Sequence, residues 1–168
     1  MSWLTLTPKL SPSQLVYVGL RDADESEKEI LEDLNIKAFY MTDVDKLGIV
    51  EVVEQALKSV DPHGKRNIHL SFDIDSLDPE DAPATGTAVG GGLTLRDGLT
   101  LCNMVHRTGR LKAVDMVEVN PSLASNKAEV EKTVNAANDL IMAALGYGNS
   151  LIEVQKRVDS ECEDLRRI

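Results

Sequence analysis

The chain has 168 residues, 42% of them hydrophobic, which is enough to bury a core as a globular protein. Its formal net charge is −10 and it has no basic patch, which excludes nucleic acid as a partner. We also expect no membrane partner, because no apolar run is long enough to cross a bilayer. Cys102 and Cys162 lie outside any metal-ligand spacing, so we expect a reducing compartment, the cytoplasm.

Alternating strands and helices are predicted between residues 15 and 145 from the hydrophobic periodicity. Short apolar runs predict strands at 15–19, 38–41, 68–72 and 111–119. Apolar residues at helical spacing predict helices at 25–34, 48–60, 94–107 and 129–145. This order predicts an α/β fold in which helical layers cover both faces of a mostly parallel sheet, a three-layer αβα arrangement.

Individual residues support two of these helices. Ile30, Leu31 and Leu34 place apolar side chains on one face of the first helix. Thr94 is suited to cap the third helix, and Asp97 follows at the position where a carboxylate completes such a cap.

The segment at 150–168 is separate from this pattern, so the predicted organisation is one domain at 1–149 followed by a tail. Leu151, Val154 and Val158 fall on one helical stripe of the tail. The stripe leaves three outcomes open: a helix that packs on the domain, a helix that pairs with another chain, or a frayed end.

The most informative stretch is residues 71–92, which read SFDIDSLDPEDAPATGTAVGGG. A buried strand leads into Asp73 and Asp75, and strand alternation predicts that both carboxylates point to the same side. Two adjacent carboxylates repel each other unless a cation neutralises them. Paired oxygen ligands at a strand end therefore predict a site for a divalent metal such as Mn²⁺ or Mg²⁺.

Two alternatives to this metal site differ in how well they fit the sequence. An EF-hand is excluded, because Leu77 and Asp78 occupy the central turn where that loop needs glycine. A metal-dependent phosphotransfer domain, with Asp73 as nucleophile, stays open as a lower-ranked hypothesis. That pattern usually continues with glycine and threonine, and Ser76 with Leu77 fits it poorly.

The longer pattern resembles the manganese ureohydrolase signature, with Ser71–Phe72–Asp73–Ile74–Asp75 followed by a proline, a Pro-Ala pair and a glycine turn. Two further stretches resemble arginases within that superfamily: GLRDAD at 19–24 and VEVNPSL at 117–123. The resemblance runs from about residue 3 to residue 146. It implies a partial arginase/deacetylase-type fold, the C-terminal half of an arginase, which lacks the N-terminal strands.

By this resemblance the activity is hydrolysis of L-arginine to L-ornithine and urea at a pair of Mn²⁺ ions. Asp73 would bridge both metals and Asp75 would bind one of them. Glu118 would pair with the substrate guanidinium, whose planar shape suits a carboxylate. Thr87 would lie in the loop that lines the pocket.

The resemblance also assigns residues away from the metals. Asp24 would help to hold the α-amino end of the substrate, with Asp22 and Glu27 in support. Arg96 and Asp97 match positions that make subunit contacts in trimeric members. A homo-oligomer is therefore one expected partner.

Part of the family's metal site is absent from the chain. The Gly-Gly-Asp-His and Asp-Ala-His-x-Asp stretches that supply the other ligands do not occur. The three histidines do not replace them: we assign His63 to a solvated turn, His69 to the core or an edge of the sheet, and His106 to a helix end. We therefore expect weak metal binding and poor activity from the chain alone.

The absent half also affects the sheet. In the arginase sheet a strand from that half lies between strands retained here, so its loss leaves unpaired backbone edges. A complementing N-terminal half is thus a second expected partner. The main alternative is a non-catalytic arginase-like subunit or interaction protein. A targeting signal would lie in the missing region, so a mitochondrial location stays open beside the cytoplasm.

Overall fold

The computed structural model describes residues 10–147. Close contacts divide the chain into two compact units, Met1–Arg66 and Asn67–Ile168, which are described one at a time. The predicted single domain at 1–149 stays a prediction, and the predicted tail at 150–168 lies outside the described residues. Within the described part of the chain, no helix is both long and apolar enough to cross a membrane.

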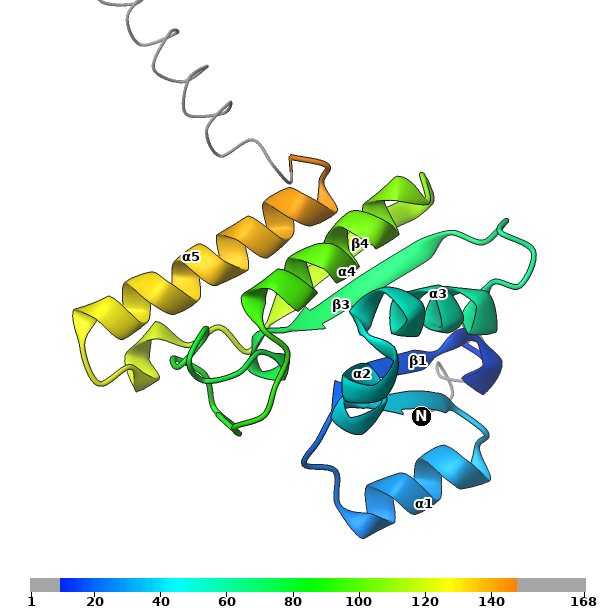
Figure 1. The fold of residues 1–168 in the computed structure, drawn as a ribbon, viewed down its shortest axis with the longest axis horizontal. Helices are drawn as coiled ribbons and strands as arrows, with labels where there is room; N and C mark the ends of the chain where they lie inside the picture. The colour runs from blue at the N-terminus through cyan, green and yellow to red at the C-terminus, as the bar shows by residue number, and fades with distance from the viewer. Residues whose placement is uncertain (1–9, 148–168) are drawn as a thin grey trace, which may run out of the picture. The chain divides into compact units, whose positions relative to one another are not determined.

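Among its described residues, the first unit contains two parallel strands, three α-helices and a short 3₁₀ helix, Pro12–Gln14 (Figure 1). Val16 pairs with Lys37 and Val18 with Phe39. In chain order the elements are β1 (Val16–Leu20), α1 (Glu25–Asp33), β2 (Lys37–Tyr40), α2 (Met41–Leu47) and α3 (Ile49–Val60).

The core of the first unit is formed by α3, whose apolar stripe Ile49, Val52, Val53 and Ala56 is buried. The helix predicted at 25–34 is found as α1, but its apolar face contributes little to the core, because Ile30 is 56% exposed and Leu34 is 50% exposed.

The predicted elements omitted α2. It forms because the Asp43 carboxylate accepts the backbone N–H of Tyr40 at 2.9 Å, which satisfies a free donor at the helix start. Gly48, at φ +80°, then separates α2 from α3.

The second unit is built on two parallel strands whose common face is covered by two helices that lie side by side (Figure 1). Ile68 pairs with Leu111, Leu70 with Val114 and Phe72 with Met116. Its elements are β3 (Ile68–Asp73), α4 (Leu95–Arg107), β4 (Leu111–Val117) and α5 (Lys127–Ala144).

Close packing of α4 against α5 and β3 depends on Gly98. A Cβ at this position would lie 2.9 Å from Cδ2 of Leu140 and 3.2 Å from Cζ of Phe72. Leu140 is fully buried and Phe72 is 4% exposed, so the helix and the strand meet through their main apolar side chains. The predicted start of α4 is confirmed, because Thr94 and Asp97 form a reciprocal cap there.

Cys102 belongs to this core and is a free thiol. Its burial raises the pKa of the thiol to about 12, so the group stays protonated at neutral pH. This thiol is therefore a packing residue and not a nucleophile.

The α/β prediction is confirmed, with parallel strands and intervening helices. Among residues 10–147 the strands form two separate two-stranded sheets, β1–β2 and β3–β4. Each of these sheets has edges that no other described strand pairs. The expectation of a strand missing between the retained ones stays a prediction.

Candidate functional site

Asp73 is the last residue of β3, at the end where ligand sites of parallel sheets gather. The chain then turns through a 3₁₀ turn, Ile74–Ser76, whose first residue is fully buried. The Ser76 hydroxyl donates to the Asp73 carbonyl at 2.7 Å, and the Asp75 N–H donates to Asp73 Oδ1 at 3.1 Å. The carboxylate of Asp73 therefore has a fixed position at the strand end.

Strand alternation was the wrong basis for predicting that Asp75 lies beside Asp73. Strand alternation does not reach Asp75, because β3 stops at Asp73 and the buried Ile74 folds the chain into a turn. The two residues stay neighbours through the hydrogen bond from the Asp75 backbone, and both side chains are half-buried. The carboxylates of Asp73 and Asp75 thus both lie at the end of β3. The 3₁₀ turn and its hydrogen bond bring them there, and strand alternation does not.

Glu118 follows β4 directly. Asp73, the last residue of β3, pairs with Val117, the last residue of β4, so Glu118 lies just past the same end of the sheet. Its φ of +61° is left-handed, a conformation that costs a residue with a Cβ about 1–3 kcal/mol and persists only where the surroundings impose it. Strain of this kind gathers at functional sites, and the Glu118 side chain is exposed here.

The loop that holds Glu118 is residues 84–86. The Thr85 hydroxyl donates to the Glu118 carbonyl at 2.9 Å, and the Asn120 N–H donates to the Ala84 carbonyl at 3.0 Å. A Cβ on Gly86 would lie 3.7 Å from Glu118 Oε2, so this loop also borders the carboxylate. The loop at 84–86 and the end of β4 therefore together hold the strained backbone of Glu118 in place.

This loop is tied in turn to α5. The fully buried Thr133 accepts the Ala84 N–H at 2.9 Å and donates to the Glu129 carbonyl at 3.0 Å through the same hydroxyl. Thr85 and Thr133 were not among the predicted site residues. The sequence did indicate that Thr133 is buried, because it lies on the apolar stripe of α5, at helical spacing from Ala136, Ala137 and Leu140.

Replacing Thr133 by valine is expected to destabilise the chain by about 1–3 kcal/mol, because the buried Ala84 N–H loses its acceptor while the side-chain volume stays the same. Urea denaturation followed by circular dichroism measures the change. Thr133→Ser keeps the hydroxyl and serves as the control. Equal stability of the valine variant and the wild type would contradict this role.

Two acidic residues of the long loop have structural partners. Asp78 Oδ2 accepts the Gly91 N–H at 2.8 Å, and Asp81 Oδ2 accepts the Leu95 N–H at 2.7 Å. A parallel bridge between Leu77 and Leu93 closes the loop at its base. These contacts hold the Pro/Gly-rich stretch after β3 in one conformation.

Replacing Gly92 by alanine is expected to disturb this closure. The new Cβ would lie 2.6 Å from the backbone of Leu77 and Asp78, which cannot move without breaking the bridge. We expect a loss of about 1–3 kcal/mol in unfolding free energy, measured by urea denaturation. Gly90→Ala meets no atom within 4 Å and should stay within about 0.5 kcal/mol of wild type. Equal losses in both variants would contradict the steric argument.

The other predicted residues of the second unit lie near this loop in sequence. Thr87 is exposed on it, and Arg96 is exposed at the start of α4. The Asp97 carboxylate accepts both the N–H and the hydroxyl of Thr94, so it caps α4. The substrate role of Thr87 and the subunit contacts of Arg96 and Asp97 stay predictions.

Asp22, Asp24 and Glu27 belong to the first unit and are exposed. Asp24 is the residue before α1, and its N–H donates to Glu27 Oε2 at 2.9 Å. This cap gives Glu27 a structural role that the sequence analysis did not name. The predicted substrate contacts of the three residues stay predictions.

The histidines lie elsewhere. His63 is exposed in a turn, as predicted, and His106 lies in the last turn of α4, where its Nδ1 is 3.0 Å from the Ala144 carbonyl. His69 takes the second of its two expected places: it is exposed on β3, a strand at the edge of its described sheet, with Nε2 2.8 Å from Asp115 Oδ2. Among residues 10–147, no three His, Cys, Asp or Glu side chains group to hold a metal ion.

Known proteins resemble this chain over most of its length. The model of the arginase family matches residues 1–146. The chain is 51% identical over 145 residues to the arginase of Glaciozyma antarctica, covering 86% of the chain and 41% of that protein. It is 50% identical to human arginase-1, covering 86% and 44%.

The fold has solved counterparts too. The arginase of Bacillus caldovelox superposes with a TM-score of 0.75 at 36% identity, over 86% of this chain and 46% of that one. The chain thus spans less than half the length of the relatives that it matches.

Proposed function

Because the chain belongs to the arginase family, we propose that it supplies part of the active site of an arginase, which hydrolyses L-arginine to L-ornithine and urea. The observation that carries the proposal is the end of the β3–β4 sheet. There Asp73 and Glu118 come from adjacent parallel strands whose pairing is fixed by the register. The Asp73 carboxylate is suited to a metal cation, and the Glu118 carboxylate is suited to the substrate guanidinium.

The residues at the end of β3 have the right kind of ligand atom for Mn²⁺, but they are too few to hold the ion by themselves. Asp73 and Asp75 offer carboxylate oxygens, the ligand type that Mn²⁺ takes. Within residues 10–147 no third metal-binding side chain joins them. When bound, the metal supplies positive charge and lowers the pKa of coordinated water. The chain alone is therefore expected to bind Mn²⁺ weakly and to be a poor catalyst.

Glu118 contributes recognition in this proposal. Its strained backbone is held by Thr85, so the carboxylate leaves the strand end in a defined direction. A carboxylate held in place pairs with guanidinium through two parallel hydrogen bonds, which orients the substrate as well as binding it. Thr87 directly follows the loop at 84–86 and would line the substrate pocket.

The remaining contacts are proposed from the family resemblance. Asp24, supported by Asp22 and Glu27, would bind the α-amino end of the substrate. Arg96 and Asp97 would make the contacts of a homo-oligomer. The free thiol of Cys102 fits a reducing compartment, the cytoplasm, as the proposed location.

The experiment compares the chain alone with a completed arginase, defined as this chain co-expressed with the part of the Glaciozyma antarctica arginase outside the matched segment. With Mn²⁺ and L-arginine, we expect the completed arginase to release urea at least about 1000-fold faster than the chain alone. The missing metal ligands account for several kcal/mol of transition-state stabilisation.

The second candidate function, a non-catalytic subunit, is favoured by the incomplete ligand set among the described residues. A completed arginase that holds Mn²⁺ but releases no urea would support it and contradict the first proposal. Rapid turnover by the chain alone would contradict the claim that its site is partial. Phosphatase activity that Asp73→Asn abolishes would favour the phosphotransfer alternative.

A further inference from the structure

The Glu118 carboxylate borders a residue of the loop at 84–86 that has no side chain. A Cβ on Gly86 would lie 3.7 Å from Glu118 Oε2, which is ordinary van der Waals contact. Apart from the chain neighbours of Gly86, no other atom of residues 10–147 lies within 4 Å of that point. The space beside Oε2 is therefore open because position 86 is glycine.

The fold itself does not require a glycine at this position. Gly86 does not adopt a left-handed φ, unlike Gly91 at φ +77°, so alanine would fit its backbone without strain. Gly86 is also exposed, so a methyl group there would not enter the core. The effect of the missing side chain is therefore confined to its one neighbour, Glu118 Oε2.

Backbone contacts hold position 86 and Glu118 at this separation. Ala84 is fully buried and Thr85 is 6% exposed, so the loop is anchored immediately before Gly86. The Thr85 hydroxyl donates to the Glu118 carbonyl at 2.9 Å, and the Ala84 N–H donates to Thr133 at 2.9 Å. A side chain at position 86 would therefore stay against the carboxylate and could not be carried away by the loop.

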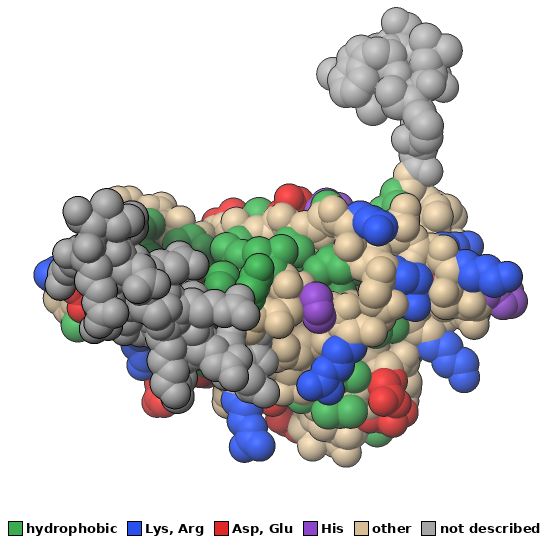
Figure 2. All heavy atoms as spheres, turned by 90° about the horizontal axis from the view of Figure 1, so that it is seen from above, with side chains coloured by type: hydrophobic (Ala, Val, Ile, Leu, Met, Phe, Trp, Pro, Cys, Tyr) green, Lys and Arg blue, Asp and Glu red, His purple; other side chains and the backbone are tan. Residues whose placement is uncertain are grey.

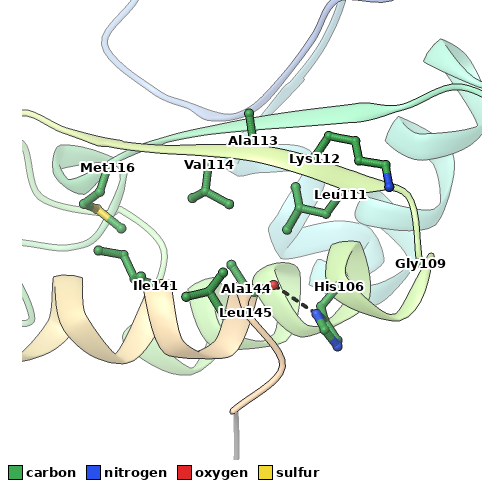
Figure 3. A pocket seen from close by; sticks show the side chains of 10 residues that line it. All are labelled: His106, Gly109, Leu111, Lys112, Ala113, Val114, Met116, Ile141, Ala144 and Leu145. Carbon is green, nitrogen blue, oxygen red and sulfur yellow. Dashed lines mark hydrogen bonds between the residues drawn. The ribbon is translucent and has the colours of Figure 1, made fainter.

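A cavity of about 500 Å³ between β4 and the C-terminal half of α5 does not compete for a cationic group. Val114 and Met116 point from β4 toward Ile141 (Figure 3). No acidic residue of the described chain lines this cavity, and Lys112 adds a positive charge to it. Figure 2 shows hydrophobic side chains gathered in an open patch on the face seen there, and such a patch offers a cation no partner. A guanidinium is therefore better served by the carboxylate of Glu118.

The two oxygens of a carboxylate serve two kinds of cation differently. A guanidinium donates two parallel hydrogen bonds and occupies both oxygens, whereas an ammonium is a point charge that one oxygen can bind. A methyl group against Oε2 would cover one side of that oxygen and hinder a second donor.

We propose that Gly86 is a specificity-determining residue, which keeps Glu118 Oε2 open so that the site prefers a guanidinium to an ammonium. The inference rests on the proposed function, because it requires that Glu118 meets the substrate guanidinium. It goes beyond that function in assigning the preference to a residue that makes no bond to the substrate.

The test compares Gly86→Ala with the wild type in the completed arginase, with L-arginine as substrate and L-lysine as competing probe. L-lysine has the same α-amino end but carries an ammonium in place of the guanidinium. We expect KM for L-arginine to rise about tenfold or more, the loss of one hydrogen bond to a charged group, with kcat nearly unchanged. The inhibition constant of L-lysine should change less than about twofold, because Oε1 stays open.

Gly90→Ala is the matched control. Gly90 is exposed, does not adopt a left-handed φ, and a Cβ there would meet no atom within 4 Å. This variant should leave both constants unchanged. Mn²⁺ content and circular dichroism check that the metal site and the fold are intact in each variant.

A double variant tests whether Gly86 acts through Glu118. In a Glu118→Gln background, Gly86→Ala should raise KM less than about twofold further, because the carboxylate that it covers is already gone. A merely structural role of Gly86 would instead give the same loss in both backgrounds.

Three results would overturn the inference: an unchanged KM in Gly86→Ala, a rise that L-lysine shares, or a rise that persists in the Glu118→Gln background. Turnover that Glu118→Gln lowers and Gly86→Ala does not would keep the proposed function and contradict this inference.

A completed arginase that releases no urea contradicts the proposed function. The dissociation constant of L-arginine, measured by calorimetry, then replaces KM. A rise of about tenfold in Gly86→Ala would keep this inference, and an unchanged constant would overturn it. A complex that does not bind L-arginine at all would overturn both.

Discussion

Replacing Asp73 by asparagine is expected to lower urea release by the completed arginase at least about 1000-fold. The amide has nearly the same shape as the carboxylate but lacks the negative charge and one of the two oxygens that a divalent cation binds. Losing several kcal/mol of charge stabilisation corresponds to a rate change of this size. The measurement is urea release at saturating L-arginine, together with the Mn²⁺ retained after gel filtration, which should fall as well.

Asp115→Asn is the matched control for this prediction. Asp115 lies in β4 opposite Ser71, on the same sheet but away from the strand end, and pairs with the exposed His69. Because an exposed pair contributes little, its loss should cost less than about 1 kcal/mol and leave Mn²⁺ content unchanged. If Asp73→Asn kept both its Mn²⁺ and its turnover, the metal role of Asp73 would be refuted.

Replacing Glu118 by glutamine is expected to lower kcat/KM for L-arginine about 100-fold or more, with Mn²⁺ content unchanged. The glutamine keeps the backbone and the size of the side chain but removes the charge that pairs with the guanidinium. Truncating one partner of a charged, hydrogen-bonded pair costs about 2–5 kcal/mol, which covers this range. Steady-state kinetics of the completed arginase measure the effect.

Glu80→Gln is the control here, because Glu80 is an exposed carboxylate on the loop that follows β3 and has no predicted role. Its kinetics should match those of the wild type. A Glu118→Gln variant that loses Mn²⁺ instead of arginine affinity would show that Glu118 supports the metal and not the substrate.

Local sequence patterns predicted most elements of the fold. The apolar run before Asp73 gave the strand, and Thr94 with Asp97 gave the start of α4, because each pattern acts over a few neighbouring residues. The same patterns missed two local features that hydrophobic periodicity does not report. They did not predict α2, whose start is capped by Asp43, and they extended strand alternation to Asp75, although the chain enters a 3₁₀ turn at the buried Ile74.

The sequence by itself determined that carboxylates end two strands and that the residues around them resemble an arginase. Only the tertiary structure placed Glu118 beside the strand of Asp73, tied Ala84 to Thr133 across the fold, and left the edge of β4 open. The physical reason is the reach of each interaction. Strand ends and helix caps are satisfied by neighbours within a few residues, whereas a backbone group in a sheet or a loop takes its partner from a segment far along the chain.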